Sequence, residues 1–358
     1  MLDFFKGKKV FITGHTGFKG TWLCEILINA GAIVKGYALE PATEPNLFSL
    51  SGIGQKMVSI IGDIRNFERL KSHFLAFNPD IAIHLAAQPL VRESYLNPRY
   101  TYDTNVMGTV NFLECVRLCP SVKSVLNVTT DKVYKNNEWE WGYRETDQLN
   151  GYDPYSNSKS CSDIITDSYR SSFFKDSPVS ISTARAGNVI GGGDFSMDRI
   201  IPDCVRSAIA NTPIIVRNPA SVRPYQHVIE PLFAYLLIVQ KQYQNKQFEG
   251  AYNVGPDESD CIETGLLVTL FCEKWNSGIH WINQGDQGPH EANFLKLDCS
   301  KIKSRIKWYP VWGITTAIEK TVEWTKAYIE KGNINEVMDQ QIRLYGNLFT
   351  QKHPDGKR

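Results

Sequence analysis

The sequence lacks three features that would place it in a specialised class of protein. No apolar run approaches the ~20 residues of a membrane-spanning helix, and residues 1–9 lack the apolar core of a signal peptide. The 39 basic and 38 acidic residues leave a formal net charge of +1, which argues against nucleic acid as a partner. None of the eight cysteines lies in a Cys-x-x-Cys pair, so we expect free thiols in a reducing cytoplasm and no metal site.

What the chain does contain is an ordinary globular composition arranged as an alternation of strands and helices. Of its 358 residues, 42% are hydrophobic, enough for the core of one large domain or two modest ones. Strand-like runs followed by helical patterns fill roughly the first half of the chain, which predicts an α/β fold with a Rossmann-type doubly wound parallel sheet. The predicted strands are 8–13, 32–39, 80–88, 122–128 and 179–184.

After Arg185 the alternation stops, and shorter elements predict a smaller C-terminal α+β substrate domain. Two stretches there, 187–194 and 219–227, are expected to be irregular loops, since they are rich in glycine or proline. The predicted domains are 1–187 plus 226–254 for the cofactor, and 188–225 plus 255–358 for the substrate.

The first predicted strand runs directly into a glycine-rich turn and then into a helical pattern at 21–28. Glycine permits a tight turn and a close approach of backbone, and a helix N-terminus offers free N–H groups to a pyrophosphate. Strand, turn and helix together predict a dinucleotide-binding loop. Its candidate cofactor contacts are Gly14, Thr16, Gly17, Phe18, Lys19 and Gly20.

The ends of the later strands supply the other candidate cofactor contacts. Asp63 is positioned to lie beside an adenine or to cap a helix at 67–77, and the two roles are compatible. Small residues at 86–87 leave room for a cofactor across the strand ends, whereas His84 is expected to be a packed core histidine. The candidates are Asp63, Ile64, Leu85, Ala86, Ala87, Gln88, Asn105 and Thr129, and Tyr155 and Lys159 are cofactor candidates as well.

The end of the second strand leaves the choice between NAD and NADP open. An acidic residue there usually binds the ribose hydroxyls of NAD, but Ala38 occupies this place and Glu40 comes two residues later. Lys19 or Lys35 could instead accept a 2′-phosphate, although a solvated surface charge is the more common role for such a lysine.

Tyr155 and Lys159 are four residues apart, which places both on one face of a predicted helix. Asp153 suits the N-cap of this helix and Pro154 its first position. A lysine ammonium beside a phenol favours the phenolate, so we expect the pKa of Tyr155 to fall from ~10 toward neutrality. Such a tyrosine can take a proton from an alcohol while a hydride leaves the same carbon. Alone, the pattern is also common on amphipathic surface helices.

The residues that follow the strand at 122–128 extend this chemistry. Thr130 is placed to hydrogen-bond the same substrate oxygen as Tyr155. Asp131 and Lys132 add an acid and a base that a simple dehydrogenase does not need, although a turn carboxylate and a surface lysine would look the same in sequence. The predicted catalytic residues are Thr130, Asp131, Lys132, Tyr155 and Lys159.

Together these motifs resemble the CDP-D-glucose 4,6-dehydratases, within the extended short-chain dehydrogenase/reductase superfamily of NAD-dependent epimerases and dehydratases. The resemblance spans 8–324 and includes the Asp131-Lys132 pair, where related dTDP-glucose dehydratases carry Asp-Glu. Thr130 stands where the family often has serine, and Tyr225 where tryptophan is expected. The other matching segments are 14–20, 86–92, 138–145, 185–194 and 290–293.

The resemblance implies NAD as cofactor and CDP-D-glucose as substrate, converted to a 4-keto-6-deoxy sugar in three steps. Tyr155 would deprotonate the C4 hydroxyl as hydride passes to NAD, water would be lost across C5 and C6, and hydride would return to C6. Asp131 would protonate the departing hydroxyl, and Lys132 would be the C5 base or a stabiliser of the enolate. The alternatives are a nucleotide-sugar 4-epimerase or a dTDP- or GDP-sugar dehydratase of the same superfamily, and a non-catalytic NAD(P)-binding regulator.

The resemblance also implies an assembly, a pathway and substrate contacts. Helices at 100–118 and 155–174 are expected to form a homodimer or a dimer of dimers. The product would serve deoxysugar synthesis for bacterial surface polysaccharide such as lipopolysaccharide O-antigen. A diphosphate sugar needs cationic and polar contacts, and the predicted ones are Gln88, Ser94, Asn188, Arg199, Arg217, Arg223, Tyr225 and His290.

Overall fold

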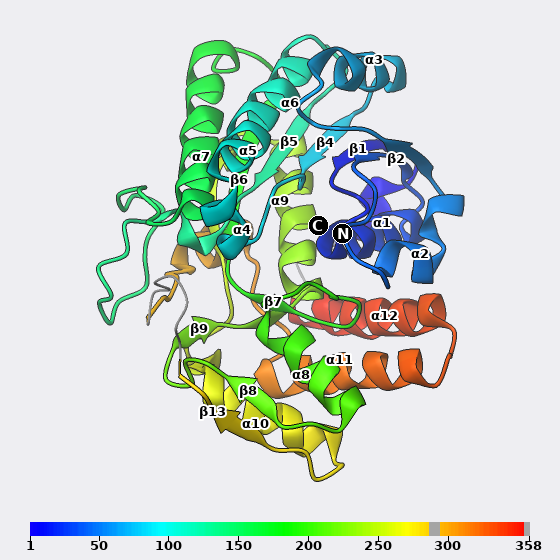
Figure 1. Ribbon diagram of the computed structural model, residues 1–358. Coiled ribbons are helices and arrows are strands. Elements are labelled where there is room, and N and C mark those ends of the chain that lie inside the picture. Colours follow the sequence, from blue (N-terminus) through cyan, green and yellow to red (C-terminus); the bar gives the residue numbers. More distant parts are fainter. Residues whose placement is uncertain (286–293, 354–358) are drawn as a thin grey trace.

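The computed structural model describes residues 1–285 and 294–353, and a parallel sheet lies at its centre (Figure 1). Seven strands pair in the order β11-β6-β5-β4-β1-β2-β3, all of them parallel. The chain winds outward in both directions from the β1–β4 pair, so the predicted doubly wound fold is confirmed. The strands are β1 (Lys9–Thr13), β2 (Ile33–Ala38), β3 (Val58–Ile61), β4 (Ile81–His84), β5 (Ser124–Val128), β6 (Ser180–Ala186) and β11 (Gly250–Val254).

Helices cover both faces of the sheet, because successive residues of a strand point to opposite faces. Val10 and Ile12 of β1 belong to the core beneath one set of helices, whereas Phe11 between them belongs to the core beneath the other. Burial on both faces explains why the strands read as nearly continuous apolar runs. The first set is α1 (Phe18–Asn29), α9 (Ile229–Gln244) and α12 (Ile334–Lys352), and the second is α3 (Phe67–Phe77), α6 (Gly108–Arg117) and α7 (Pro154–Phe173).

The long helix expected at 100–118 is built in parts. After α4 (Val91–Leu96), the chain forms α5 (Pro98–Tyr102), a π-helical turn (Asp103–Met107) and then α6. A π-helical turn widens the helix locally and often marks a functional place. Here the turn carries Asn105, which points back to the end of β4.

A smaller unit lies below the sheet in Figure 1 and has a core of its own. Leu267 and Phe271 pack there against Ile201, Cys204 and Ile318, all of them buried. The elements of this unit are α8 (Ile200–Ala210), α10 (Thr264–Trp275), α11 (Ile314–Ile329), β8 (Ile214–Val216), β9 (Val222–Pro224), β12 (Cys261–Glu263) and β13 (Trp281–Asn283).

The two stretches expected to be irregular contain short strands, so that prediction was wrong. β7 (Val189–Ile190) pairs in parallel with β10 (Gln226–His227), and β9 pairs antiparallel with β12. Each pairing joins segments far apart in sequence, and glycine content alone does not exclude such pairing. The pairing of β7 with β10 joins residues on the two sides of the predicted domain boundary between 225 and 226.

The proposed division into two domains stays a prediction, but the last helix bears on it. α12 shares the core of α1 and α9, and the Tyr345 hydroxyl on α12 donates to Glu230 of α9 at 2.6 Å. Asn29 of α1 donates to Asp339 of α12 at 2.6 Å. The C-terminal helix therefore packs on the sheet half of the molecule.

Several smaller predictions are confirmed. All eight cysteines are free, and His84 is buried, stacked on Phe112 and hydrogen-bonded to Thr13 at 2.7 Å. No helix in the described ranges has the length and apolar character needed to cross a membrane. The remaining short elements are α2 (Leu47–Ser51), 3-10 turns at Leu2–Phe5, Ile53–Gln55, Asp131–Val133, Lys246–Phe248 and Glu258–Asp260, and a π-helical turn at Ile302–Ile306.

Candidate active site

The glycine turn is shaped for close backbone contact. Gly14 has φ +78°, and a Cβ there would lie 2.7 Å from the Ala86 nitrogen. A Cβ on Gly20 would lie 2.1 Å from the Gly14 carbonyl oxygen. Helix α1 starts at N-cap Gly17, which offers no side chain to its first-turn N–H groups. A helix N-terminus left without a side-chain cap fits a pyrophosphate, as the sequence predicts.

Hydrogen bonds hold the end of β4 beside this turn. The Thr13 hydroxyl accepts the N–H groups of Leu85 at 3.1 Å and Ala86 at 3.2 Å. Asn105 accepts from the Gln88 backbone at 2.8 Å and donates to Ser158 of α7 at 2.8 Å. These two predicted cofactor residues, Gln88 and Asn105, therefore brace the strand end against α7.

The end of β3 and its neighbours place the remaining predicted cofactor residues. Asp63 is paired with Arg65 at 2.6 Å, and hydrogen bonding to Arg65 lowers the pKa of its carboxyl. Ile64 is buried, and a Cβ on Gly108 would lie 2.9 Å from its Cγ2. The Lys35 ammonium donates to the His73 carbonyl of α3 at 3.1 Å, so this side chain is directed toward α3.

Helix α7 begins as the sequence predicts. The Asp153 side chain accepts the Ser156 N–H at 2.9 Å, and Pro154 occupies the first turn. This cap sets where the helix starts and therefore where Tyr155 and Lys159 lie. The buried Lys159 ammonium donates to the Val128 carbonyl, the last of β5, at 3.0 Å.

The expected fall in the pKa of Tyr155 is wrong for this structure. Burial raises the pKa of Tyr155 to about 12, although hydrogen bonding with Thr130 and the charge of Arg199 oppose the rise. Burial also lowers the pKa of Lys159 to about 8, helped by Lys19. The lysine charge acts on the Val128 carbonyl, and the desolvation of the phenol outweighs the favourable charges near it.

The turn after β5 places a carboxyl group in the interior. The Thr130 hydroxyl donates to Asp131 Oδ1 at 2.9 Å, while Asp131 Oδ2 is buried and has no hydrogen-bond partner within the described ranges. Burial raises the pKa of Asp131, opposed first by Lys132. Space for the carboxyl depends on Gly187, where a Cβ would lie 3.2 Å from Oδ2. Asp131 is thus no surface turn residue, and a buried carboxyl of raised pKa suits a proton donor.

Cationic residues from both halves converge near Asp131. The pKa of Lys19, in the glycine turn, falls to about 8 through burial and the charge of Arg199, with Asp131 and Asp194 opposing. Arg199 precedes α8 and pairs with Asp194 at 2.8 Å. Arg223 is buried in β9 and acts electrostatically on Asp131. The glycine turn, the turn after β5 and the smaller unit therefore meet at one place.

The other predicted substrate residues are spread more widely. Asn188 accepts the Gln226 N–H through its backbone carbonyl at 3.0 Å. Arg217 is paired with Asp198 at 3.2 Å, and the Tyr225 hydroxyl lies 2.9 Å from that of Thr264. Ser94 is buried and donates to the Val91 carbonyl at 2.6 Å. His290 lies outside the described residues.

Sequence reasoning missed a buried ion pair next to the site. Arg185 at the end of β6 pairs with Asp163 of α7, and Thr129, predicted as a cofactor contact, donates its hydroxyl to Asp163 at 3.0 Å. One signal was available, because Asp163 follows Lys159 by four residues and so lies on the same helix face. Its partner Arg185 comes more than twenty residues later, on strand β6, so no local pattern in the sequence connects the two residues.

Comparison with known proteins identifies the class to which this fold and site belong. Residues 11–321 match the family model described as GDP-mannose 4,6 dehydratase, so the chain belongs to this family of nucleotide-sugar dehydratases. Within it, the chain is 48% identical to CDP-glucose 4,6-dehydratase of Salmonella typhimurium, over 98% of this chain and 100% of that protein. It is 26% identical to a dTDP-glucose 4,6-dehydratase of Xanthomonas campestris, over 93% of this chain and 97% of that one.

Solved structures agree with the fold. A UDP-glucose 4-epimerase of Thermus thermophilus in complex with NAD superposes with a TM-score of 0.77 at 22% identity, covering 89% of this chain and 99% of that chain. A dTDP-glucose 4,6-dehydratase of Bacillus anthracis in complex with NAD gives a TM-score of 0.75 at 20% identity, covering 91% and 99%. At these identities the likeness establishes the shared architecture.

Proposed function

We propose that this protein is a CDP-glucose 4,6-dehydratase that works with NAD. The observation that carries the proposal is the buried Asp131 beside Tyr155, because a carboxyl of raised pKa supplies the acid that loss of water requires. A 4-epimerase or a reductase has no use for it. The relative at 48% identity supports the substrate, and the two NAD complexes of the same fold support the cofactor.

The glycine turn fits the pyrophosphate of NAD, which when bound accepts a hydride from the sugar and returns it. The first-turn N–H groups of α1, at Phe18, Lys19 and Gly20, would hold this end of the cofactor, and Gly14 and Gly17 would allow the turn to approach it closely. The end of β4, braced by Asn105, would border the rest of the cofactor site.

The chain's own groups move the protons. Tyr155 takes the proton of the sugar C4 hydroxyl, with Thr130 bonded to the same oxygen. With a pKa of about 12 the phenol is protonated at neutral pH, so positive charge must be brought beside it before it acts as a base. Asp131 then donates a proton to the departing C6 hydroxyl, and the C5 proton passes to a base. Lys132, half-buried beside Asp131, serves as that base or stabilises the enolate.

Arginines around the site suit a sugar nucleotide with two phosphates. We place Arg199, Arg217 and Arg223 on the diphosphate side, with Asn188 and Tyr225 nearby. Asp194 and Asp198, which pair with Arg199 and Arg217, hold these side chains at the edge of the smaller unit. Bidentate arginine contacts are well matched to phosphate.

A product assay separates the candidate reactions. The purified protein is incubated with NAD and one sugar nucleotide at a time, and the 4-keto-6-deoxy product is followed by its absorbance in alkali. We expect product from CDP-glucose and little from dTDP-glucose or GDP-mannose. Product from another nucleotide alone would retain the chemistry and overturn the substrate. A 4-epimer without any keto product would overturn the dehydratase and favour the epimerase.

We also propose a homodimer formed through α6 and α7. Exposed apolar side chains support it, namely Ile164 and Phe173 on α7, and Met107 and Leu118 directly before and after α6. Ile164→Glu should convert the dimer to a monomer in sedimentation experiments, because it places a charge in the apolar contact. Ile329→Glu on α11 is the matched control, since the two side chains are similarly exposed at 52% and 43%. A dimer that survives Ile164→Glu would contradict this interface.

The cellular role follows from the same proposal. The eight free cysteines support a reducing cytoplasm. A 4-keto-6-deoxy sugar on a nucleotide is a precursor of deoxysugars, and we assign the product to surface polysaccharide such as O-antigen. Loss of these deoxysugars from the polysaccharide of a strain without the gene would test the assignment.

A further inference from the structure

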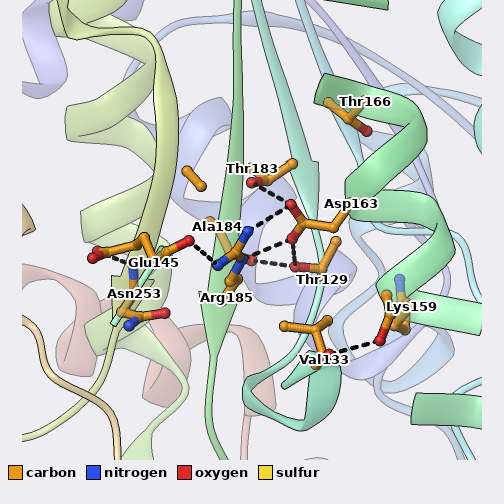
Figure 2. A network of polar contacts seen from close by, with 12 residues as sticks. Thr129, Val133, Glu145, Lys159, Asp163, Thr166, Thr183, Ala184, Arg185 and Asn253 are labelled. Carbon is orange, nitrogen blue, oxygen red and sulfur yellow. Dashed lines mark hydrogen bonds and ion pairs between the residues drawn. The ribbon is translucent and has the colours of Figure 1, made fainter. Parts of the chain in front are cut away.

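The guanidinium of Arg185 joins three segments of the chain at a single buried point (Figure 2). Its Nε and Nη2 donate to the two oxygens of Asp163, each at 2.9 Å. Its Nη1 donates to the Tyr134 hydroxyl at 2.8 Å and to the Glu145 carbonyl at 3.0 Å. Both side chains of the ion pair are only 4% exposed. All three guanidinium nitrogens are therefore used inside the protein.

These contacts grip both ends of the turn that carries Asp131. Before the turn, the Thr129 hydroxyl donates to Asp163 at 3.0 Å. After the turn, the Tyr134 hydroxyl accepts from Arg185 and donates to Asn253 of β11 at 2.6 Å. The turn itself, Asp131–Val133, is a single 3-10 turn. Such a short element has little rigidity of its own, so its place depends on the anchors at its two ends.

A third segment reaches the same point. Glu145 accepts the Asn253 N–H through its side chain at 2.8 Å and the Arg185 guanidinium through its carbonyl. Asn253 also donates to the Tyr143 carbonyl at 2.7 Å. The segment between the turn and α7 is thus tied to β6 and β11. Figure 2 shows Glu145 and Asp163 approaching Arg185 from opposite sides.

Tyr155 and Lys159 depend on different supports. Both residues lie on α7, whose first turn is capped by Asp153, and the Lys159 ammonium donates to the Val128 carbonyl. Arg185 touches neither residue. It holds the turn against α7 through Asp163, two helical turns beyond Tyr155. Arg185 therefore contacts the segment after the turn directly, through Tyr134, but reaches Tyr155 and Lys159 only through Asp163 and α7. Helix α7 also bonds to the turn itself, since Ser160 donates to the Val133 carbonyl at 2.7 Å.

We propose that Arg185 is a positioning residue for the elimination half of the reaction, an inference that rests on the proposed function. In that half, the C5–H and C6–O bonds break and a C5–C6 double bond forms. The C5 proton goes to the base, and the hydroxyl leaves as water with a proton from Asp131. Both proton transfers require the turn to be held within a fraction of an ångström. Oxidation at C4 uses Tyr155 on α7 and Thr130 before the turn, and the hydrogen bonds of Arg185 go to neither residue.

Two variants test this division. Arg185→Lys keeps the charge opposite Asp163 but loses the fork that reaches Tyr134 and Glu145. Tyr134→Phe keeps the ion pair and removes only the hydroxyl that ties the end of the turn. We expect formation of 6-deoxy product to fall on the order of 100-fold in Arg185→Lys, and less in Tyr134→Phe.

The decisive readout is the fate of the sugar in a single turnover. In both variants, 4-keto-glucose and the near-ultraviolet absorbance of reduced cofactor should accumulate, because oxidation outruns elimination. Hydrogen exchange measured without substrate should be faster over residues 130–134 and unchanged over α7. Glu230→Gln is the control, because Glu230 lies in a buried hydrogen-bonded network that does not touch the site.

The outcomes separate this inference from the proposed function. A wild-type protein that makes no keto sugar from any nucleotide sugar would remove the proposed function, whatever the variants do. An active wild type whose two variants slow oxidation and elimination equally would overturn the positioning role. If Arg185→Lys does not fold, Tyr134→Phe decides alone by the same readout.

Discussion

Two buried carboxyl groups lie near the end of β5: Asp131 in the turn that follows it, and Asp163 on α7. They differ in the hydrogen bonds that they accept. Around Asp163, both carboxylate oxygens accept hydrogen bonds, from Arg185, Thr129 and Thr183. Around Asp131, one oxygen accepts from Thr130 and the other has no partner among the described side chains. Both carboxyls are buried, so their difference lies in what surrounds them.

The pKa values follow that difference. Burial alone would lower the pKa of the Arg185 guanidinium. The hydrogen bonds and the charge of Asp163 outweigh burial and raise this pKa. In the candidate active site, burial shifts each group toward its neutral form: the pKa rises for Asp131 and Tyr155 and falls to about 8 for Lys159. Paired charges fix positions, whereas incompletely solvated neutral groups are ready to exchange protons.

Loss of the proposed proton acceptor at C4 should have the largest effect. Tyr155→Phe removes only the hydroxyl, so we expect turnover of CDP-glucose to fall about 10²–10⁴-fold. Neither 4-keto sugar nor reduced cofactor should accumulate, because the block precedes both. Thermal unfolding of the variant serves as the control and should be unchanged or slightly higher, since a buried phenol is removed. Turnover within tenfold of wild type would move the base to another residue.

Breaking the paired group should cost stability. Asp163→Asn leaves the Arg185 charge buried without a counterion, which we expect to lower the free energy of unfolding by about 3–5 kcal/mol. Urea unfolding followed by tryptophan fluorescence would measure it. An equal change at an exposed ion pair, Asp167→Asn beside Arg170, should cost less than about 1 kcal/mol. A loss at Asp163 no larger than that would mean the ion pair is not what holds these segments.

The sequence was sufficient for those parts of the molecule that local patterns determine. The strand–helix alternation predicts the sheet, the glycine spacing predicts the turn before α1, and Asp153-Pro154 predicts the start of α7. Each signal lies within one element or between two consecutive ones. The same applies to Asp131, whose position directly after β5 is readable from the chain.

What the sequence could not supply depends on segments that meet only after folding. Arg185 on β6 bonds to Tyr134 after the turn and to Asp163 on α7, and β7 pairs with β10 much later in the chain. The pKa of Tyr155 was predicted in the wrong direction for the same reason. Spacing along a helix shows that Lys159 is near, but it does not show how deeply the phenol is buried or that Lys159 bonds to Val128.

A third buried carboxyl, that of Glu230, is intermediate between Asp163 and Asp131 in the hydrogen bonds and charges that surround it. Among the residues that the structure describes, Glu230 accepts three hydrogen bonds, from the Val311 and Trp312 backbones and from Tyr345, and none of them comes from a cation. Burial raises its pKa from 4.5 to about 7. The folded chain then binds more protons than the unfolded chain between these values. The stabilisation it contributes is therefore complete below about pH 4.5 and is lost as the pH rises toward 7.

Glu230→Gln tests this intermediate case. Glutamine keeps the shape and the backbone contacts but cannot ionise. The unfolding free energy of the variant relative to wild type should therefore rise by about 3 kcal/mol between pH 4.5 and 8. Urea unfolding at a series of pH values measures the difference. A difference that stays constant with pH would mean the hydrogen bonds hold the pKa of Glu230 near its ordinary value.

The smallest predicted effect gives the clearest contrast. An Asp→Asn substitution should stabilise the fold at Asp131 and destabilise it at Asp163. Asp131→Asn removes a carboxyl whose pKa is raised by burial, so we expect unfolding to become slightly harder at pH 8. The gain should shrink as the pH falls, since wild-type Asp131 then carries its proton. The variant should still oxidise CDP-glucose but release little 6-deoxy product. If Asp131→Asn instead destabilised the fold as Asp163→Asn does, Asp131 would be a paired, ionised residue, and the acid for the departing hydroxyl would have to be sought elsewhere. Stability gained where activity is lost would mark Asp131 as a group kept for chemistry at a cost to the fold.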